Sequence, residues 1–197
     1  FPRLLVALNF SSQYNFIDDI QFFSYLSKKA HSKGISSILP DIEKCKDDYL
    51  KISLQLVVDQ IPVDDLKSTL SESIEYTQKR HQEGIIFFET MGNYSPAFGL
   101  FGTVIGLIKM LSHLTSPDLL GQGMALAMVT TFYGIIFAQL IFYPIAGRLN
   151  SLSFQEALHK EMIMIGVLSL ARKDPSFVIK EKMQLFLSGK ERAQIWQ

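Results

Sequence analysis

The stretch YSPAFGLFGTVIGLIKML, residues 94–111, decides the fold of this chain. It is apolar and dotted with glycine, and it overlaps a run, residues 90–108, that contains no charged side chain. A second uncharged run covers residues 119–147. Because a membrane span needs about 20 predominantly apolar residues, both runs are long enough to cross a bilayer. Two such runs in a chain of 197 residues favour two membrane helices over two core helices of a soluble protein.

Basic residues on the outer flanks of the two runs indicate their orientation. Lys79 and Arg80 precede the first run, and Arg148 follows the second. Because an excess of Lys and Arg marks the cytoplasmic side of a membrane protein, the first span is expected to lead outward and the second to return. The expected order is a cytoplasmic helical loop domain, a span, a short periplasmic loop, a second span and a cytoplasmic helical tail, at residues 1–85, 86–112, 113–119, 120–147 and 148–197.

Small residues recur at helical spacing in both spans. Lipid provides little hydrophobic force between helices, so small side chains serve to let two helix backbones approach closely. We therefore expect a packing stripe in each span, formed by Gly99, Gly102 and Gly106 in the first and by Ala127, Gly134 and Ala138 in the second.

Three threonines lie beside these stripes: Thr103 in the first span, and Thr130 and Thr131 in the second. A threonine hydroxyl inside a span either bonds its own backbone one turn back or lines a wet path with polar partners. Neither uncharged run contains Asp, Glu, Lys, Arg or His, although a proton or cation path usually needs an ionisable group at membrane depth. If the chain conducts ions, another subunit or a preceding segment must supply that group.

The segments outside the spans are helical in pattern, so the whole chain is expected to be all-α. Apolar residues recur at helical spacing in residues 16–34 and 63–93, and the length and polar faces of residues 47–61 favour a helix there too. The net charge of zero gives no argument for a nucleic-acid partner. We find no catalytic or metal-binding motif, and the single cysteine, Cys45, is interpreted as a bystander. No enzymatic activity, catalytic residue, metal site or cofactor is therefore expected.

The stretch YSPAFGLFGTVIGLIKML, together with GMALAMVTTFYGIIFAQLIFYPIAGRL, resembles the third and fourth spans of the MotA/PomA family, the channel subunits of the bacterial flagellar stator. The segment LQLVVDQI and the tail EMIMIGVLSLARKDPSFVIKEKMQLFLSGKER are similar to cytoplasmic segments of that family. The resemblance covers nearly the whole chain. It implies that two further spans precede residue 1, and that the protein is a multi-pass protein of the bacterial inner membrane.

The resemblance also implies partners and a mechanism. Family subunits form a ring, expected to be a pentamer, around two copies of a MotB/PomB-type partner that carries a membrane aspartate and a peptidoglycan-binding domain. Ion passage by that aspartate drives the ring, whose cytoplasmic loop pushes the rotor protein FliG, so the missing membrane acid belongs to the partner. On the family pattern, Pro96 and Pro144 shape the cytoplasmic ends of the two spans, where the helices must bend or move.

The threonines bear on which ion is transported. Sodium-type members of the family resemble this chain in the pattern FGTxIG and in the TT pair of the fourth span. Physically, hydroxyl and carbonyl oxygens replace water around a hard cation, whereas a proton needs a carboxylate and water. Thr103, Thr130 and Thr131 therefore favour Na+ over H+ as the transported ion.

The expected rotor contact departs from the family pattern. His31 stands where the family usually has Arg, and Leu39 stands where it usually has Glu. Lys28, Lys29 and Lys33 are expected to supply positive charge nearby. The spans alone would also fit an energiser of the TolQ/ExbB type, which powers an envelope process, or a membrane scaffold that does not conduct.

Overall fold

The computed structural model describes residues 14–114, 117–187, 189 and 191–192. Every regular element among these residues is a helix, and they contain no strand. The expectation of an all-α chain is therefore confirmed.

The described chain divides into two compact units. The hairpin unit comprises residues 79–152. The bundle unit comprises the described residues up to 78 and from 153 onward. Two long helices, α5 (Val63–Leu111) and α7 (Tyr143–Ala171), contribute to both units.

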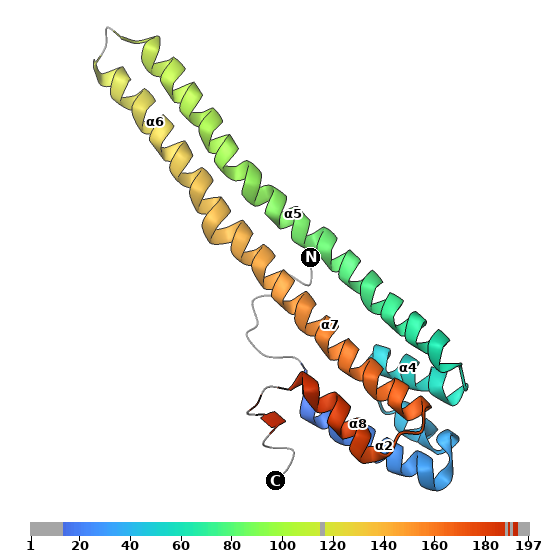
Figure 1. Cartoon of the computed structure of the whole chain (residues 1–197). Helices are drawn as coiled ribbons and strands as arrows, with labels where there is room; N and C mark the ends of the chain where they lie inside the picture. The colour runs from blue at the N-terminus through green and yellow to red at the C-terminus, as the bar shows by residue number, and fades with distance from the viewer. Residues whose placement is uncertain (1–13, 115–116, 188, 190, 193–197) are drawn as a thin grey trace. The chain divides into compact units, whose positions relative to one another are not determined.

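The hairpin unit is built from two antiparallel helical arms. The first arm is the C-terminal part of α5, and the second contains α6 (Pro117–Ile136), the π-helix η2 (Phe137–Phe142) and the start of α7 (Figure 1). Pro117 occupies the first position of α6, where the missing backbone N–H of proline costs nothing.

Both arms meet the requirements for membrane spans. The helical runs Val63–Leu111 and Leu119–Ala171 contain windows with mean hydropathies of 1.4 and 1.9, and 11% of each window is buried inside the chain. Large apolar side chains are correspondingly exposed, as Phe98 (71%) and Leu100 (64%) show. Because an apolar surface of this extent needs lipid or another protein to cover it, the hairpin has the character of a membrane element.

The expected boundary between the loop domain and the first span lies inside one continuous helix. Helix α5 passes through residue 86 without interruption, because the amphipathic pattern that begins at Val63 continues directly into the apolar run. The turn between the arms begins after Leu111, and part of the expected loop at residues 113–119 lies outside the described residues.

The bundle unit packs shorter helices against the ends of α5 and α7. Helix α2 (Phe16–Lys33) stops where the sequence predicted, because Gly34 adopts a φ of +84°, a conformation that side chains with a Cβ rarely take. Asp47 caps α4 (Asp48–Val58) by accepting a hydrogen bond of 2.9 Å from the backbone N–H of Leu50. The other short elements of the unit are η1 (Ile35–Ile38), α3 (Leu39–Ile42), α8 (Ser176–Met183) and η3 (Gln184–Phe186).

The core of the bundle unit joins five helices. Fully buried side chains come from α2, α4, α5, α7 and α8, namely Phe23, Leu54, Leu66, Ile163 and Ile179. Burial of such a cluster is the main force that holds the short helices on the long ones.

Candidate functional site

The two arms of the hairpin unit meet through glycine. A Cβ atom placed on Gly99 would lie 2.9 Å from the carbonyl oxygen of Thr130 and 3.5 Å from the Cα atom of Gly134. A Cβ on Gly134 would in turn lie 2.8 Å from the carbonyl oxygen of Ser95. The backbones of α5 and α6 are therefore in contact at this level, as expected for small residues between membrane helices.

The same contact continues toward the turn. A Cβ on Gly106 would lie 2.6 Å from the carbonyl oxygen of Gly123 and 2.8 Å from the backbone nitrogen of Ala127. A Cβ on Gly102 would clash with the Thr130 side chain. The structure thus brings Gly99, Gly102, Gly106, Ala127 and Gly134 to one interface, whereas Ala138 lies buried in the π-helix η2.

Each of the three threonine hydroxyls bonds the backbone of its own helix. Thr103 donates to the carbonyl oxygen of Leu100 at 2.6 Å, Thr131 to that of Ala127 at 3.0 Å, and Thr130 to a carbonyl oxygen one turn back at 3.0 Å. These bonds use the single O–H donor and leave the lone pairs of each oxygen. The hydroxyls therefore remain possible cation ligands, because a cation binds the lone pairs and not the proton.

A groove of about 640 Å³ runs along the hairpin unit. Thr130 lines this groove, but Thr103 and Thr131 do not, and most of its other lining side chains are aromatic, including Phe98, Tyr133 and Phe137. A wall of this composition does not hydrate an ion. The groove, as the described residues line it, is therefore mainly apolar.

The two prolines stand where the backbone of each arm is weakened. Pro96 lies inside α5, and Pro144 lies in the first turn of α7, directly after the π-helix. Proline has no backbone N–H, so each one leaves a carbonyl oxygen of the preceding turn without its helical partner. At Tyr143 the backbone N–H donates to the carbonyl oxygen of Ala138, a wider turn than that of an α-helix.

A polar contact joins the arms beside the prolines. The Tyr143 hydroxyl donates a hydrogen bond of 2.8 Å to Oδ1 of Asn93, and a Cβ on Gly92 would lie 2.8 Å from the Tyr143 ring. Sequence reasoning missed both Tyr143 and Asn93. The signal available was their position, since Tyr143 directly precedes Pro144 and Asn93 lies three residues before Pro96.

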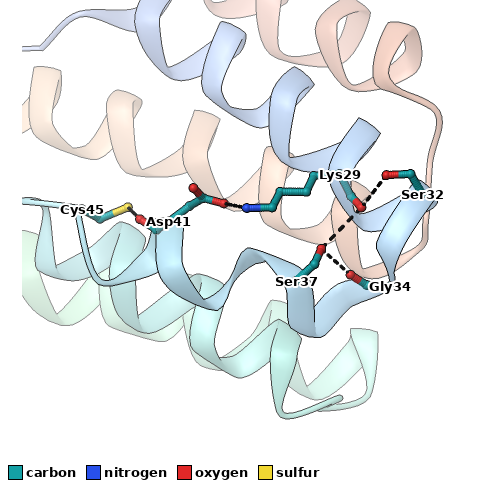
Figure 2. Close-up of polar contacts among 6 residues, drawn as sticks. All are labelled: Lys29, Ser32, Gly34, Ser37, Asp41 and Cys45. Carbon is teal, nitrogen blue, oxygen red and sulfur yellow. Dashed lines mark hydrogen bonds and ion pairs between the residues drawn. The ribbon is translucent and has the colours of Figure 1, made fainter.

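The expected rotor-contact residues differ in their availability. Figure 2 shows Lys29 directed at Asp41, with Nζ 2.6 Å from Oδ2, and this hydrogen bond raises the pKa of Lys29. Lys28 and Lys33 are exposed and make no hydrogen bond or ion pair with the rest of the described chain. Lys29 is therefore engaged within the bundle unit, which leaves Lys28 and Lys33 as the available positive charges on α2.

The fourth expected rotor-contact residue, His31, reaches a distant turn. Its Nε2 atom lies 3.3 Å from the carbonyl oxygen of Asp174, which also accepts a hydrogen bond of 3.1 Å from Ser27. The Asp174 carboxylate accepts a hydrogen bond of 2.6 Å from Lys182, and this bond holds the pKa of Asp174 below its usual value. Asp174 thus ties the turn after α7 to both α2 and α8.

The described residues provide little for catalysis. They contain no group of three or more His, Cys, Asp or Glu side chains arranged to hold a metal ion. Cys45 is half-buried, and its burial raises the pKa of its thiol, so the thiol stays protonated and is a poor nucleophile at neutral pH.

Comparison with known proteins identifies a family and similar structures. Residues 41–162 match the model of the MotA/TolQ/ExbB proton channel family. Motility protein A of Borreliella burgdorferi is 35% identical over 184 residues, which are 93% of this chain and 71% of that protein. Chemotaxis protein PomA of Vibrio alginolyticus is 34% identical over 145 residues, which are 74% of this chain and 57% of that protein.

A solved structure matches the whole chain. The structure of the flagellar MotAB stator complex from Bacillus subtilis superposes with a TM-score of 0.91 at 31% identity, covering 100% of this chain and 77% of the matched one. The chain therefore spans only part of the length of each of these proteins.

Proposed function

Because this chain belongs to the MotA/TolQ/ExbB proton channel family, we propose that it is a MotA/PomA-type stator subunit that couples ion flow to rotation of a flagellum. The observation that carries the proposal is the hairpin unit, in which α5 and α6 touch through glycine and present hydroxyls but no ionisable group in their uncharged runs. Since the family is one of channel proteins, the expectation that the chain is not an enzyme is confirmed.

The acid that the pathway needs would come from a MotB/PomB-type partner in the bacterial inner membrane. Two observations support this: the uncharged runs contain no acid, and the similar Bacillus subtilis structure is that of a MotAB complex. Copies of the chain, five on the family pattern, would surround the partner. The exposed apolar side chains of both arms are then covered by neighbouring helices and lipid.

The torque would pass to the rotor protein FliG through the bundle unit. Lys28 and Lys33 support this role because they are exposed on α2, while Lys29 is held by Asp41. Exposed charges of this kind set the rate and register of an encounter more than its affinity.

Sodium is the ion that we propose for this pathway. Thr103, Thr130 and Thr131 each donate their proton to their own helix, so their oxygens present lone pairs to a cation. A partly dehydrated Na+ gains from such oxygens, whereas a proton hopping between water and a carboxylate does not need them.

The test uses the full-length protein, expressed with its own partner subunit in a strain that lacks both. Swimming speed is recorded against external sodium concentration at constant membrane potential, and ion flux is measured in vesicles that contain the complex. Thr103→Val removes the hydroxyl at nearly constant volume, and Thr103→Ser retains it as the matched control. We expect Thr103→Val, but not Thr103→Ser, to raise the sodium concentration that gives half-maximal speed.

Each other outcome has a definite meaning. Speed that is independent of sodium in the wild type, or an equal response of the two variants, would overturn the sodium assignment. Ion flux without any effect on motility would favour a TolQ/ExbB-type energiser, and no flux in the presence of the partner would favour a scaffold.

A further inference from the structure

Tyr143 makes a contact between the two arms that glycine packing does not explain. Its ring lies against Gly92, and its hydroxyl donates a hydrogen bond of 2.8 Å to Asn93. All three residues belong to the hairpin unit, and the bond links positions 50 residues apart in the chain. Tyr143 on α7 thereby contacts the backbone of α5 at Gly92 and bonds a side chain of α5 at Asn93.

The hydrogen bond between Tyr143 and Asn93 lies where both arms have lost regular backbone hydrogen bonds. Pro96 lies three residues after Asn93, and Pro144 directly follows Tyr143. Each proline removes a backbone hydrogen bond, and the π-helix η2 ends at this level. Because sharp helix bends occur at prolines and at π-helical turns, this is where the arms bend most easily, and a bond between them here sets their separation.

Two features argue that the contact is specific and not incidental. An exposed carboxamide such as that of Asn93 is unfavourable in an apolar segment unless it has a polar partner, and the Tyr143 hydroxyl provides one. Gly92 leaves the space that the tyrosine ring fills, since any Cβ at that position would collide with the ring. Gly92 and Asn93 therefore match Tyr143: the glycine makes room for the ring, and the carboxamide accepts the hydrogen bond.

We propose that Tyr143 and Asn93 are positioning residues for ion passage. Their hydrogen bond holds the two proline-bearing segments at the spacing that conducts, and its loss lets the segments separate into a poorly conducting arrangement. Hydrogen bonds between membrane helices shift such an equilibrium by about threefold on average. The inference rests on the proposed function, since it needs an ion flux to position.

The experiment measures flux per complex in vesicles containing the full-length protein and its partner, together with hydrogen–deuterium exchange of residues 90–96 and 140–146. Tyr143→Phe removes the donor, Asn93→Leu removes the acceptor, and the double variant removes both. Tyr94→Phe is the matched control, because Tyr94 is 61% exposed and its hydroxyl bonds no other described residue.

We expect each single variant to lower the maximal flux, by at most about threefold, and to speed exchange in both segments. The double variant should be no worse than either single one, and the ion concentration for half-maximal flux should stay unchanged in all of them. A structural defect in assembly would instead lower the amount of complex while leaving the flux per complex unchanged.

Three results would overturn the inference. The first is a Tyr143→Phe variant with the same flux and exchange rates as Tyr94→Phe. The others are additive losses of flux in the double variant, or a loss confined to the amount of complex. Failure of the proposed function would look different, because the wild-type complex would then conduct no ions at all.

Discussion

A Cβ atom placed on Gly106 would lie 2.6 Å from the carbonyl oxygen of Gly123, and a Cβ placed on Gly123 would lie 2.7 Å from the carbonyl oxygen of Gly106. The relation is reciprocal, so the backbones of α5 and α6 touch at this point with no side chain between them. Neither backbone can yield to an added methyl group without moving its helix. Packing is the main attraction between membrane helices, so this contact fixes the hairpin.

The substitution Gly123→Ala is predicted to push the arms apart and to destabilise the hairpin unit by about 1–3 kcal/mol, the usual effect of overpacking. Gly121→Ala is the matched control, because a Cβ at Gly121 meets nothing within 4 Å. The measurement is the thermal unfolding of the complex in detergent, alongside motility. Equal melting temperatures for the two variants would show that the arms are not in backbone contact there.

The spans and their small residues were predictable because composition and helical period are local properties of a sequence. Gly99 and Gly106 were predicted as packing residues from the helical period alone. Gly123, the partner of Gly106, was missed, because its pairing depends on how far α6 is shifted along α5. Periodicity identifies the face of one helix and not the register of two.

Contacts between distant parts of the chain could not be predicted from the sequence for a related reason. His31 is a candidate rotor contact on the family pattern, and the fold shows that it also reaches the carbonyl oxygen of Asp174, 143 residues away. Lys29 was expected to supply positive charge, and the fold pairs it with Asp41 on the short helix that follows the Gly34 turn. A charge pattern shows that a residue is polar, while only the fold shows which partner it has.

His159 on α7 is predicted to matter more for its ring than for its charge. It is 5% exposed, its Nε2 lies 2.6 Å from Oδ2 of Asp19, and its ring stacks on Tyr14 at 4.4 Å between centroids. Its Nδ1 atom is buried without a hydrogen-bond partner in the described chain. His159→Ala should therefore lower the stability of the bundle unit by about 2–4 kcal/mol, through the cavity and the lost bond.

The variant His159→Phe separates these two effects. It keeps an aromatic ring between Asp19 and Tyr14 and removes the unpaired nitrogen, and water can still reach Asp19, whose side chain is 22% exposed. We expect it to lose less than half as much stability as His159→Ala in thermal unfolding of the complex. An equal loss in both variants would assign the stabilisation to the hydrogen bond with Asp19.

The lysines of α2 are predicted to divide into two classes. Lys28→Glu and Lys33→Glu should reduce swimming speed without changing the melting temperature, because both side chains are exposed and bond no other described residue. Lys29→Glu should lower the melting temperature, because it places a carboxylate against Asp41. The two measurements are the swimming speed of cells and the melting temperature of the purified complex. Equal effects of Lys28→Glu and Lys29→Glu on stability would remove this distinction.

The ion pair between the Asp174 carboxylate and Lys182 is predicted to weaken in acid. The Lys182 ammonium donates to its carboxylate and lowers the pKa from its ordinary value of 3.8. A carboxyl whose pKa is lower in the folded state stabilises fully above its unfolded value, and this stabilisation is lost as the pH falls through the folded value. Asp174→Asn removes the carboxylate, so its melting temperature should lie below that of the wild type at pH 7.

The difference between the two proteins should stay constant down to about pH 5 and shrink below about pH 4, as the wild-type carboxyl binds its proton. Lys182→Met provides the matched control, because it removes the donor and leaves the carboxylate. In that background Asp174→Asn should change the melting temperature much less at pH 7. The hydrogen bonds from Ser27 and His31 go to the backbone carbonyl of residue 174 and are unaffected by the exchange. A difference that persisted undiminished at pH 3, or that survived in the Lys182→Met background, would show that the ion pair with Lys182 is not the source of the stabilisation.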